Sequence, residues 1–211
     1  MKTIIVCSPR GGSGKSVLCV HLSVAAELRG DGPVALLDAD PLGFAFNCCE
    51  VRRRRFLDTP TAEHVTPTGV RRALAKLESG GSRYAIINTP PSITSTSLEM
   101  LRCGDLVFVP VDPTVPELRA LRKALPEIVA ISRSLAFIWC RASKILRAAH
   151  AAGLTELGSL GSVFKANLRE RAIYTEPFVH GYAAFEDKRN GDAASEDVFA
   201  IWAEVREKLG A

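Results

Sequence analysis

The feature that most constrains the fold is a glycine-rich stretch, CSPRGGSGKS, at residues 7–16. It follows an apolar run, KTIIVC at residues 2–7, and it leads into apolar residues at helical spacing over residues 14–30. A strand, a glycine-rich turn ending in Gly-Lys-Ser and a helix, in this order, are the context that identifies a phosphate-binding loop. The glycines let backbone N–H groups face phosphate oxygens, and the start of the helix adds a positive dipole end.

Two side chains of this loop carry the chemistry that a nucleotide site needs. Lys15 is expected to reach the β- and γ-phosphates, and the Ser16 hydroxyl is expected to bind Mg²⁺. The alternative, a glycine-rich turn with a chance Lys-Ser pair, is disfavoured because both the strand and the helix are in place. We therefore expect ATP or ADP with Mg²⁺ as cofactors. The expected contacts of the nucleotide are Gly11, Gly12, Ser13, Gly14, Lys15, Ser16 and Val17.

Apolar runs alternate with helical patterns along the rest of the 211-residue chain. Strands are expected at 33–40, 84–92, 105–113 and 135–140, with a weaker one at 160–167. Helices are expected at 67–81, 98–104, 115–132 (bent near Pro126), 144–153, 168–176 and 194–210. Residues 43–67 are expected to form a short helix and then a loop. Apolar strands separated by helices are typical of a parallel sheet covered on both faces. We therefore expect a single α/β domain over residues 1–211, with a mostly parallel twisted sheet flanked by helices, of the P-loop NTPase type.

Composition narrows the functional classes without choosing one. The formal net charge of +4 permits nucleic-acid binding but does not demonstrate it. Six cysteines without a CxxC pair indicate free thiols in a reducing cytoplasm rather than a zinc site. No stretch approaches the roughly 18 consecutive apolar residues of a membrane span. The apolar stripe of the last helix lies opposite a face of mixed charge, which favours packing on the sheet over membrane binding.

Five segments resemble the motifs of the ParA/MinD family of dimeric ATPases, in the family's order. The loop RGGSGKS resembles the family's deviant Walker A motif. The later segments are VALLDADPLG, YAIINTPPS, CGDLVFVPVDPTVPELRAL and SVFKANLRERAIYTEPFVHGYAAFE. The length most resembles the small plasmid-partition ParA proteins without an N-terminal DNA-binding domain. The resemblance implies an ATPase that dimerises on ATP, binds DNA without sequence preference at the nucleoid, and is stimulated by a centromere-binding or adaptor protein.

The resemblance also implies roles for individual side chains. Arg10 stands where the family has a lysine that crosses the dimer interface to the partner's nucleotide; alternatively, it points to solvent. Asp38 matches the carboxylate that orients or activates the attacking water, and Asp40 is expected to support Mg²⁺. The expected catalytic residues are Arg10, Lys15 and Asp38, and the expected metal site comprises Ser16, Asp40 and Asn88.

Asn88 departs from the family pattern, which has an aspartate at the end of this strand. An amide keeps an acceptor oxygen but loses the negative charge that Mg²⁺ prefers. Three interpretations remain open. Asn88 holds a metal-bound water, or the protein is an ATP-gated switch with little hydrolysis, or Thr89 faces the site instead.

Two further sets of residues are inferred from the resemblance. Arg141, Pro177 and Phe178 are expected to flank the adenine base. Nonspecific DNA binding is expected to involve basic residues, although a run of charges is more often a solvated surface. The DNA-binding candidates are Arg52, Arg53, Arg54, Arg55, Lys165, Arg169 and Arg171.

Overall fold

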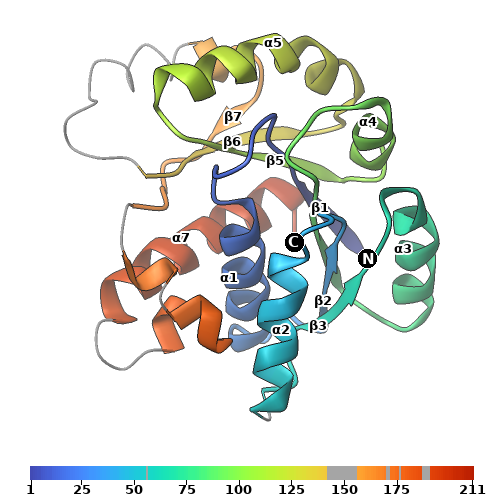
Figure 1. Ribbon diagram of the computed structural model, residues 1–211, viewed down its shortest axis with the longest axis vertical. Helices are drawn as coiled ribbons and strands as arrows, with labels where there is room; N and C mark the ends of the chain where they lie inside the picture. Colours follow the sequence, from blue (N-terminus) through green and yellow to red (C-terminus); the bar gives the residue numbers. More distant parts are fainter. Residues whose placement is uncertain (56, 142–155, 170–171, 176, 187–190) are drawn as a thin grey trace.

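The computed structural model describes residues 1–55, 57–141, 156–169, 172–175, 177–186 and 191–211. Within these residues, seven strands form one parallel sheet in the order β3-β2-β4-β1-β5-β6-β7 (Figure 1). The strands are β1 (Lys2–Val6), β2 (Val34–Asp38), β3 (Thr61–His64), β4 (Tyr84–Asn88), β5 (Leu106–Val111), β6 (Leu135–Trp139) and β7 (Ser162–Val163). The parallel α/β architecture expected from the sequence is therefore confirmed.

Helices cover both faces of this sheet. The α-helices are α1 (Lys15–Leu28), α2 (Phe44–Arg54), α3 (Val70–Ser79), α4 (Ser95–Leu101), α5 (Val115–Ile131) and α7 (Gly191–Leu209). Short 3₁₀ helices are η1 (Pro67–Gly69), η3 (Ala172–Tyr174), η4 (Pro177–His180) and η5 (Ala184–Glu186). Figure 1 shows α1, α2 and α7 on one face and α3, α4 and α5 on the other.

Strand side chains divide alternately between these two layers. In β1, Ile4 and Val6 are buried with α1 and α7, whereas Ile5 is buried with α4 and α5. Both faces of the strand therefore meet apolar neighbours, which explains why β1 reads as a continuous apolar run.

The strand order places the ends of several strands around the glycine-rich loop. β1 lies between β4 and β5, while β2, the next strand in the chain, lies beyond β4. The register sets Val6 and Asp38 on either side of Asn88, at the carboxyl ends of three adjacent strands. Ligands of open α/β sheets bind outside the carboxyl ends of the strands, where the strand order reverses. The fold therefore places the loop beside Asp38 and Asn88, at the carboxyl ends of the strands.

The expectations for residues 43–67 and 160–176 need correction. Thr61–His64 forms the edge strand β3, parallel to β2, instead of a loop. Its sequence TAEH carries no apolar signal because three of its four residues are exposed. At the other edge, β7 has only two residues. Within the expected helix 168–176, the described residues include Leu168, which forms a parallel bridge with Cys140, and the 3₁₀ turn Ala172–Tyr174. The expected helix 144–153 lies outside the described residues.

The last helix, α7, packs on the sheet as its apolar stripe predicted. Val198, Ile201 and Trp202 are buried in the core that α7 shares with α1 and the sheet. The Trp202 indole donates a hydrogen bond to Asp31 Oδ2 at 2.8 Å, so its one polar atom is paired. No helix in the described part of the chain is long and apolar enough to cross a membrane.

The cysteines are free, and all except Cys103 are buried. Burial raises the pKa of the Cys7 and Cys140 thiols to about 12. Since the thiolate is the reactive form, these cysteines act as small core residues, as the sequence predicted.

Candidate nucleotide-binding site

The glycine-rich loop has the backbone of a phosphate cradle. Gly12 and Gly14 have φ angles of 84° and 88°, a region that other L-residues rarely adopt. A Cβ at either position would meet no atom within 4 Å, so backbone conformation rather than space requires glycine here. Gly14 is also the N-cap residue of α1, and it has no side chain that could cap the helix. The first N–H groups of α1 are therefore free of a capping side chain, as an anion site at a helix start requires.

Lys15 is buried within this loop, with only 5% of its surface exposed. Its Nζ donates a hydrogen bond to the Arg10 carbonyl oxygen at 3.1 Å. Burial lowers the pKa of Lys15, and the nearby Asp40 carboxylate opposes that shift by favouring the charged form. The ammonium is therefore held at the loop, where a phosphate would be its stronger partner.

The Ser13 hydroxyl of the loop, unlike Lys15 Nζ, has no hydrogen-bond partner among the described residues. Ser13 is 2% exposed, and its Oγ makes no hydrogen bond to any described residue. A buried hydroxyl without a partner costs about 1–3 kcal/mol, so the site is satisfied better by a polar ligand than by the protein alone. This orphaned atom, the buried lysine and the glycine conformations fit a bound nucleotide.

Asp38 is fully buried and holds the loop after β2 in place. Its Oδ1 accepts hydrogen bonds from the Asp40 N–H at 3.1 Å and from Asn88 Nδ2 at 2.8 Å. Its Oδ2 accepts the Phe46 N–H at 2.9 Å, so Asp38 caps the first turn of α2. A carboxylate has about four acceptor positions, which leaves about one for a water molecule.

Asn88 presents hydrogen-bond donors to the site. Besides Asp38, its Nδ2 faces Ser16 Oγ at 3.2 Å, and its Oδ1 lies 4.0 Å from the Cys19 sulfur. A carboxylate such as Asp38 has acceptors but no donor, so the Asn88 amide must turn its Nδ2 toward Asp38. In this orientation the amide oxygen faces α1, so Asn88 does not offer an acceptor beside Ser16. Its predicted role in holding Mg²⁺ would then have to be indirect.

Ser16 and Asp40 lie together at the mouth of the loop. They line a hollow of about 310 Å³ with loop residues, Leu42, Phe44 and Pro91. Within the described residues, no cluster of three or more His, Cys, Asp or Glu side chains could hold a metal by itself. Mg²⁺ bound beside a nucleotide keeps water and phosphate oxygens as ligands and needs few protein groups. A hydroxyl and a carboxylate in one hollow, as Ser16 and Asp40 are here, would fit such a site.

Arg10 and Glu117 make a contact that the sequence did not predict. Glu117 belongs to the first turn of α5 and is 6% exposed. Its Oε2 lies 3.9 Å from Arg10 Nε, and its Oε1 accepts a hydrogen bond from Ser8 Oγ at 3.1 Å. The Arg10 side chain remains half exposed, so the second cation of the loop is both accessible and tethered.

A larger hollow of about 540 Å³ adjoins the loop. Its lining residues are Ser13, Gly14, Val17, Cys140, Arg141, Leu168, Arg169, Ala172, Tyr174 and Thr175. Arg141 also lines the smaller hollow around the loop, so it lies where the two meet. The structure therefore brings the predicted Arg141 to the site. The side chains of Pro177 and Phe178 lie outside the described part of the chain, and the 3₁₀ turn that contains them, η4, contacts α2.

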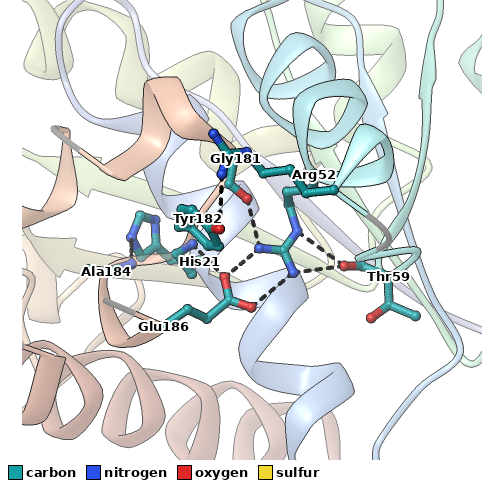
Figure 2. A network of polar contacts seen from close by, with 9 residues as sticks. His21, Arg52, Thr59, Gly181, Tyr182, Ala184 and Glu186 are labelled. Carbon is teal, nitrogen blue, oxygen red and sulfur yellow. Dashed lines mark hydrogen bonds and ion pairs between the residues drawn. The ribbon is translucent and has the colours of Figure 1, made fainter. Parts of the chain in front are cut away.

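The four consecutive arginines predicted to bind DNA differ in burial, because one is buried and three are exposed. Arg52 is buried, and its guanidinium is bound by Glu186 and by the carbonyl oxygens of Thr59 and Gly181 (Figure 2). It is therefore unable to contact DNA, and that part of the prediction is wrong. The exposed candidates are Arg53, Arg54, Arg55, Lys165 and Arg169, whereas Arg171 lies outside the described residues.

No protein-family profile matches the chain, and no curated protein matches it. Solved structures do match along nearly its whole length. An McdA variant of Cyanothece in complex with ATP is 21% identical, with coverage of 100% of this chain and 96% of that one and a TM-score of 0.71. The septum site-determining protein MinD of Pyrococcus horikoshii with Mg-ADP is 16% identical, with coverage of 100% and 97% and a TM-score of 0.72. A plasmid partition protein of Borrelia burgdorferi is 15% identical, with coverage of 97% and 98% and a TM-score of 0.69.

These similarities define a class through the fold. The parallel sheet, with the glycine-rich loop after its central strand β1, has the architecture of the P-loop fold. Within that class, the chain has the fold of the ParA/MinD type, to which the matching structures belong. The fold that the motif resemblance implied is thereby confirmed.

Proposed function

We propose that the protein is an ATPase of the ParA/MinD type that dimerises on binding ATP. As a dimer it binds DNA without sequence preference, and it segregates DNA or positions another large cargo from the nucleoid in the cytoplasm. A centromere-binding or adaptor protein stimulates hydrolysis. One observation carries this proposal: a phosphate loop with a second cation, Arg10, lies at the carboxyl ends of the strands together with Asp38, the last residue of β2, and with Asp40, which lines the same hollow as the loop.

The proposed site divides the work among few side chains. The loop N–H groups, Lys15 and Ser13 bind the phosphates, while Ser16 and Asp40 bind Mg²⁺. The metal ion, when bound, neutralises phosphate charge. Asp38 uses its remaining acceptor position to orient the attacking water, and Arg141 lies beside the base. Each of these groups lines the hollows next to the loop or hydrogen-bonds to a residue that does.

Arg10 makes dimerisation part of the proposal. Its guanidinium is a fork that can grip phosphate oxygens of a partner's nucleotide with two parallel hydrogen bonds. We expect Arg10→Ala to weaken ATP-dependent dimerisation strongly, to a level that sedimentation still measures at high protein concentration, and to lower phosphate release. Arg10→Lys should keep both. Sedimentation velocity with ATP or ADP, together with a phosphate-release assay, measures the two effects. Unchanged dimerisation and turnover in Arg10→Ala would show that the proposal is wrong.

DNA binding is the second half of the proposal. Exposed cations on α2 and after β7 would contact phosphates, so binding should weaken steeply between 50 and 200 mM salt. Fluorescence anisotropy with a labelled random duplex, in ATP and in ADP, tests this. A binding curve that responds to neither salt nor nucleotide would exclude the DNA role and leave the cargo to an adaptor protein.

A second candidate function is an ATP-gated switch with negligible hydrolysis. Asn88 favours it, because the site lacks the carboxylate that would retain Mg²⁺ most strongly. Steady-state phosphate release with DNA and Mg²⁺ separates the two functions. An ATP-dependent dimer without turnover would support the switch, and turnover stimulated by DNA would support the ATPase.

A further inference from the structure

We infer that Glu117 is a positioning residue that holds Arg10 over the phosphate loop for the partner subunit. The inference rests on the proposed dimerising function and names a residue that this function needs. It begins from a carboxylate that is nearly buried, lies outside the loop in the sequence, and touches the loop at two places.

The local sequence offers Glu117 a different role. Thr114 precedes the first turn of α5, and Glu117 is the third residue of that helix, which is the spacing of a capping box. In a capping box, the glutamate accepts a hydrogen bond from the N–H of the capping residue. Here the Thr114 N–H is bound by Asp112 Oδ1 at 3.1 Å. Asp112 thus replaces Glu117 at the helix start, and Glu117 reaches the phosphate loop instead.

The Glu117 carboxylate restrains both the side chain of Arg10 and, through Ser8, the backbone of Arg10. The carboxylate contacts Arg10 Nε directly, at 3.9 Å. It also accepts the Ser8 hydroxyl hydrogen at 3.1 Å, and Ser8 Oγ accepts the Arg10 N–H at 3.3 Å. The Arg10 carbonyl is bound by Lys15 at 3.1 Å. The backbone of Arg10 is therefore fixed on both sides, and Glu117 restricts the side chain that remains.

The geometry of this contact leaves the terminal nitrogens of Arg10 available to a phosphate of the partner subunit's nucleotide. A carboxylate that sequesters an arginine binds the terminal nitrogens of its fork in pairs. Glu117 approaches Nε instead, and no hydrogen bond from either Nη atom of Arg10 to a described residue is found. Half of the Arg10 side chain remains exposed. The fork can therefore meet a phosphate while Glu117 keeps its hold on Nε.

The test compares Glu117→Gln with Glu127→Gln, an exposed acid on the same helix whose change removes the same charge. Both subunits of a dimer would lose the Arg10–Glu117 contact. Losing one such partly exposed pair weakens the affinity between subunits by about threefold. Glu117→Gln should therefore weaken ATP-dependent dimerisation by about tenfold. Nucleotide affinity of the monomer, measured with a fluorescent ATP analogue, should stay within about twofold of the parent. Glu127→Gln should match the parent in both assays.

Two further measurements separate positioning from a structural role. In Arg10→Ala, adding Glu117→Gln should cause no further loss of dimerisation, because the contact is already gone. In nucleotide-free protein, phenylglyoxal should modify Arg10 faster in Glu117→Gln than in the parent, as followed by peptide mass spectrometry. Normal dimerisation of Glu117→Gln, additive losses in the double variant, or an unchanged modification rate would each overturn the inference. A parent protein that does not dimerise with ATP would overturn the proposed function as well.

Discussion

Replacing Arg52 should lower the free energy of unfolding more than replacing any of the other three arginines in residues 52–55. The Arg52 side chain is 3% exposed and connects α2 to the segment before α7 (Figure 2). Both of its terminal nitrogens bind the Glu186 carboxylate. Its Nε and one terminal nitrogen also donate to the Thr59 carbonyl, at 3.2 and 3.0 Å, and the other donates to Gly181 at 3.0 Å.

Truncation to alanine would remove the Arg52 donors from two carbonyl oxygens and from Glu186, whose Oε2 would keep the hydrogen bond from the Ala183 N–H at 2.7 Å. Removing one partner of a buried ion pair costs about 3–5 kcal/mol. Water can reach Glu186, whose side chain is 17% exposed, so we expect the low end of this range for Arg52→Ala, about 3 kcal/mol. For a chain of this length, that loss lowers the melting temperature by about 6–12 °C.

Urea and thermal denaturation, followed by circular dichroism, measure this loss. The matched control is Arg53→Ala, because Arg53 is the next residue of α2 and is 67% exposed, and its ion-pair partner among the described residues is Glu50. It should leave the midpoint unchanged. Combining Arg52→Met with Glu186→Leu should recover part of the stability, since no buried charge is left alone. Equal midpoints for Arg52→Ala and Arg53→Ala would refute the role assigned to the ion pair.

Two other expected outcomes concern His21 and Asn88. Burial lowers the pKa of His21 to about 4, so unfolding takes up a proton below pH 6.5, and the free energy of unfolding should fall by about 2 kcal/mol from pH 7 to 5. Urea midpoints should show this fall in the parent and in a variant of the exposed His180, but not in His21→Gln; a fall retained in His21→Gln would contradict it. Asn88→Asp sets a carboxylate against Asp38, so it should destabilise the nucleotide-free protein by about 1–3 kcal/mol. Mg²⁺ with ATP should stabilise Asn88→Asp more than the parent in thermal shift assays, and a normal melting temperature without nucleotide would refute the charge conflict.

The sequence predicted those parts of the site that are local in the chain. Glycines at Gly12 and Gly14, followed by Lys15 and Ser16, specify the loop because positive φ angles and a helix start are properties of a few consecutive residues. The core strands were predictable for a similar reason, since each is buried on both faces. The edge strand Thr61–His64 was missed because pairing on one side only leaves it mostly exposed and polar.

What the sequence by itself determined is therefore the phosphate loop, the parallel sheet and the family resemblance. The tertiary structure decided which distant groups meet. Ser8 and Glu117 are separated by 109 residues, and Arg52 and Glu186 by 134. Those pairings depend on the strand order, which sets α5 beside the loop and brings the segment before α7 against α2. No periodicity or spacing within one segment encodes that order, so an arginine that looked like a DNA contact proved to be part of the core.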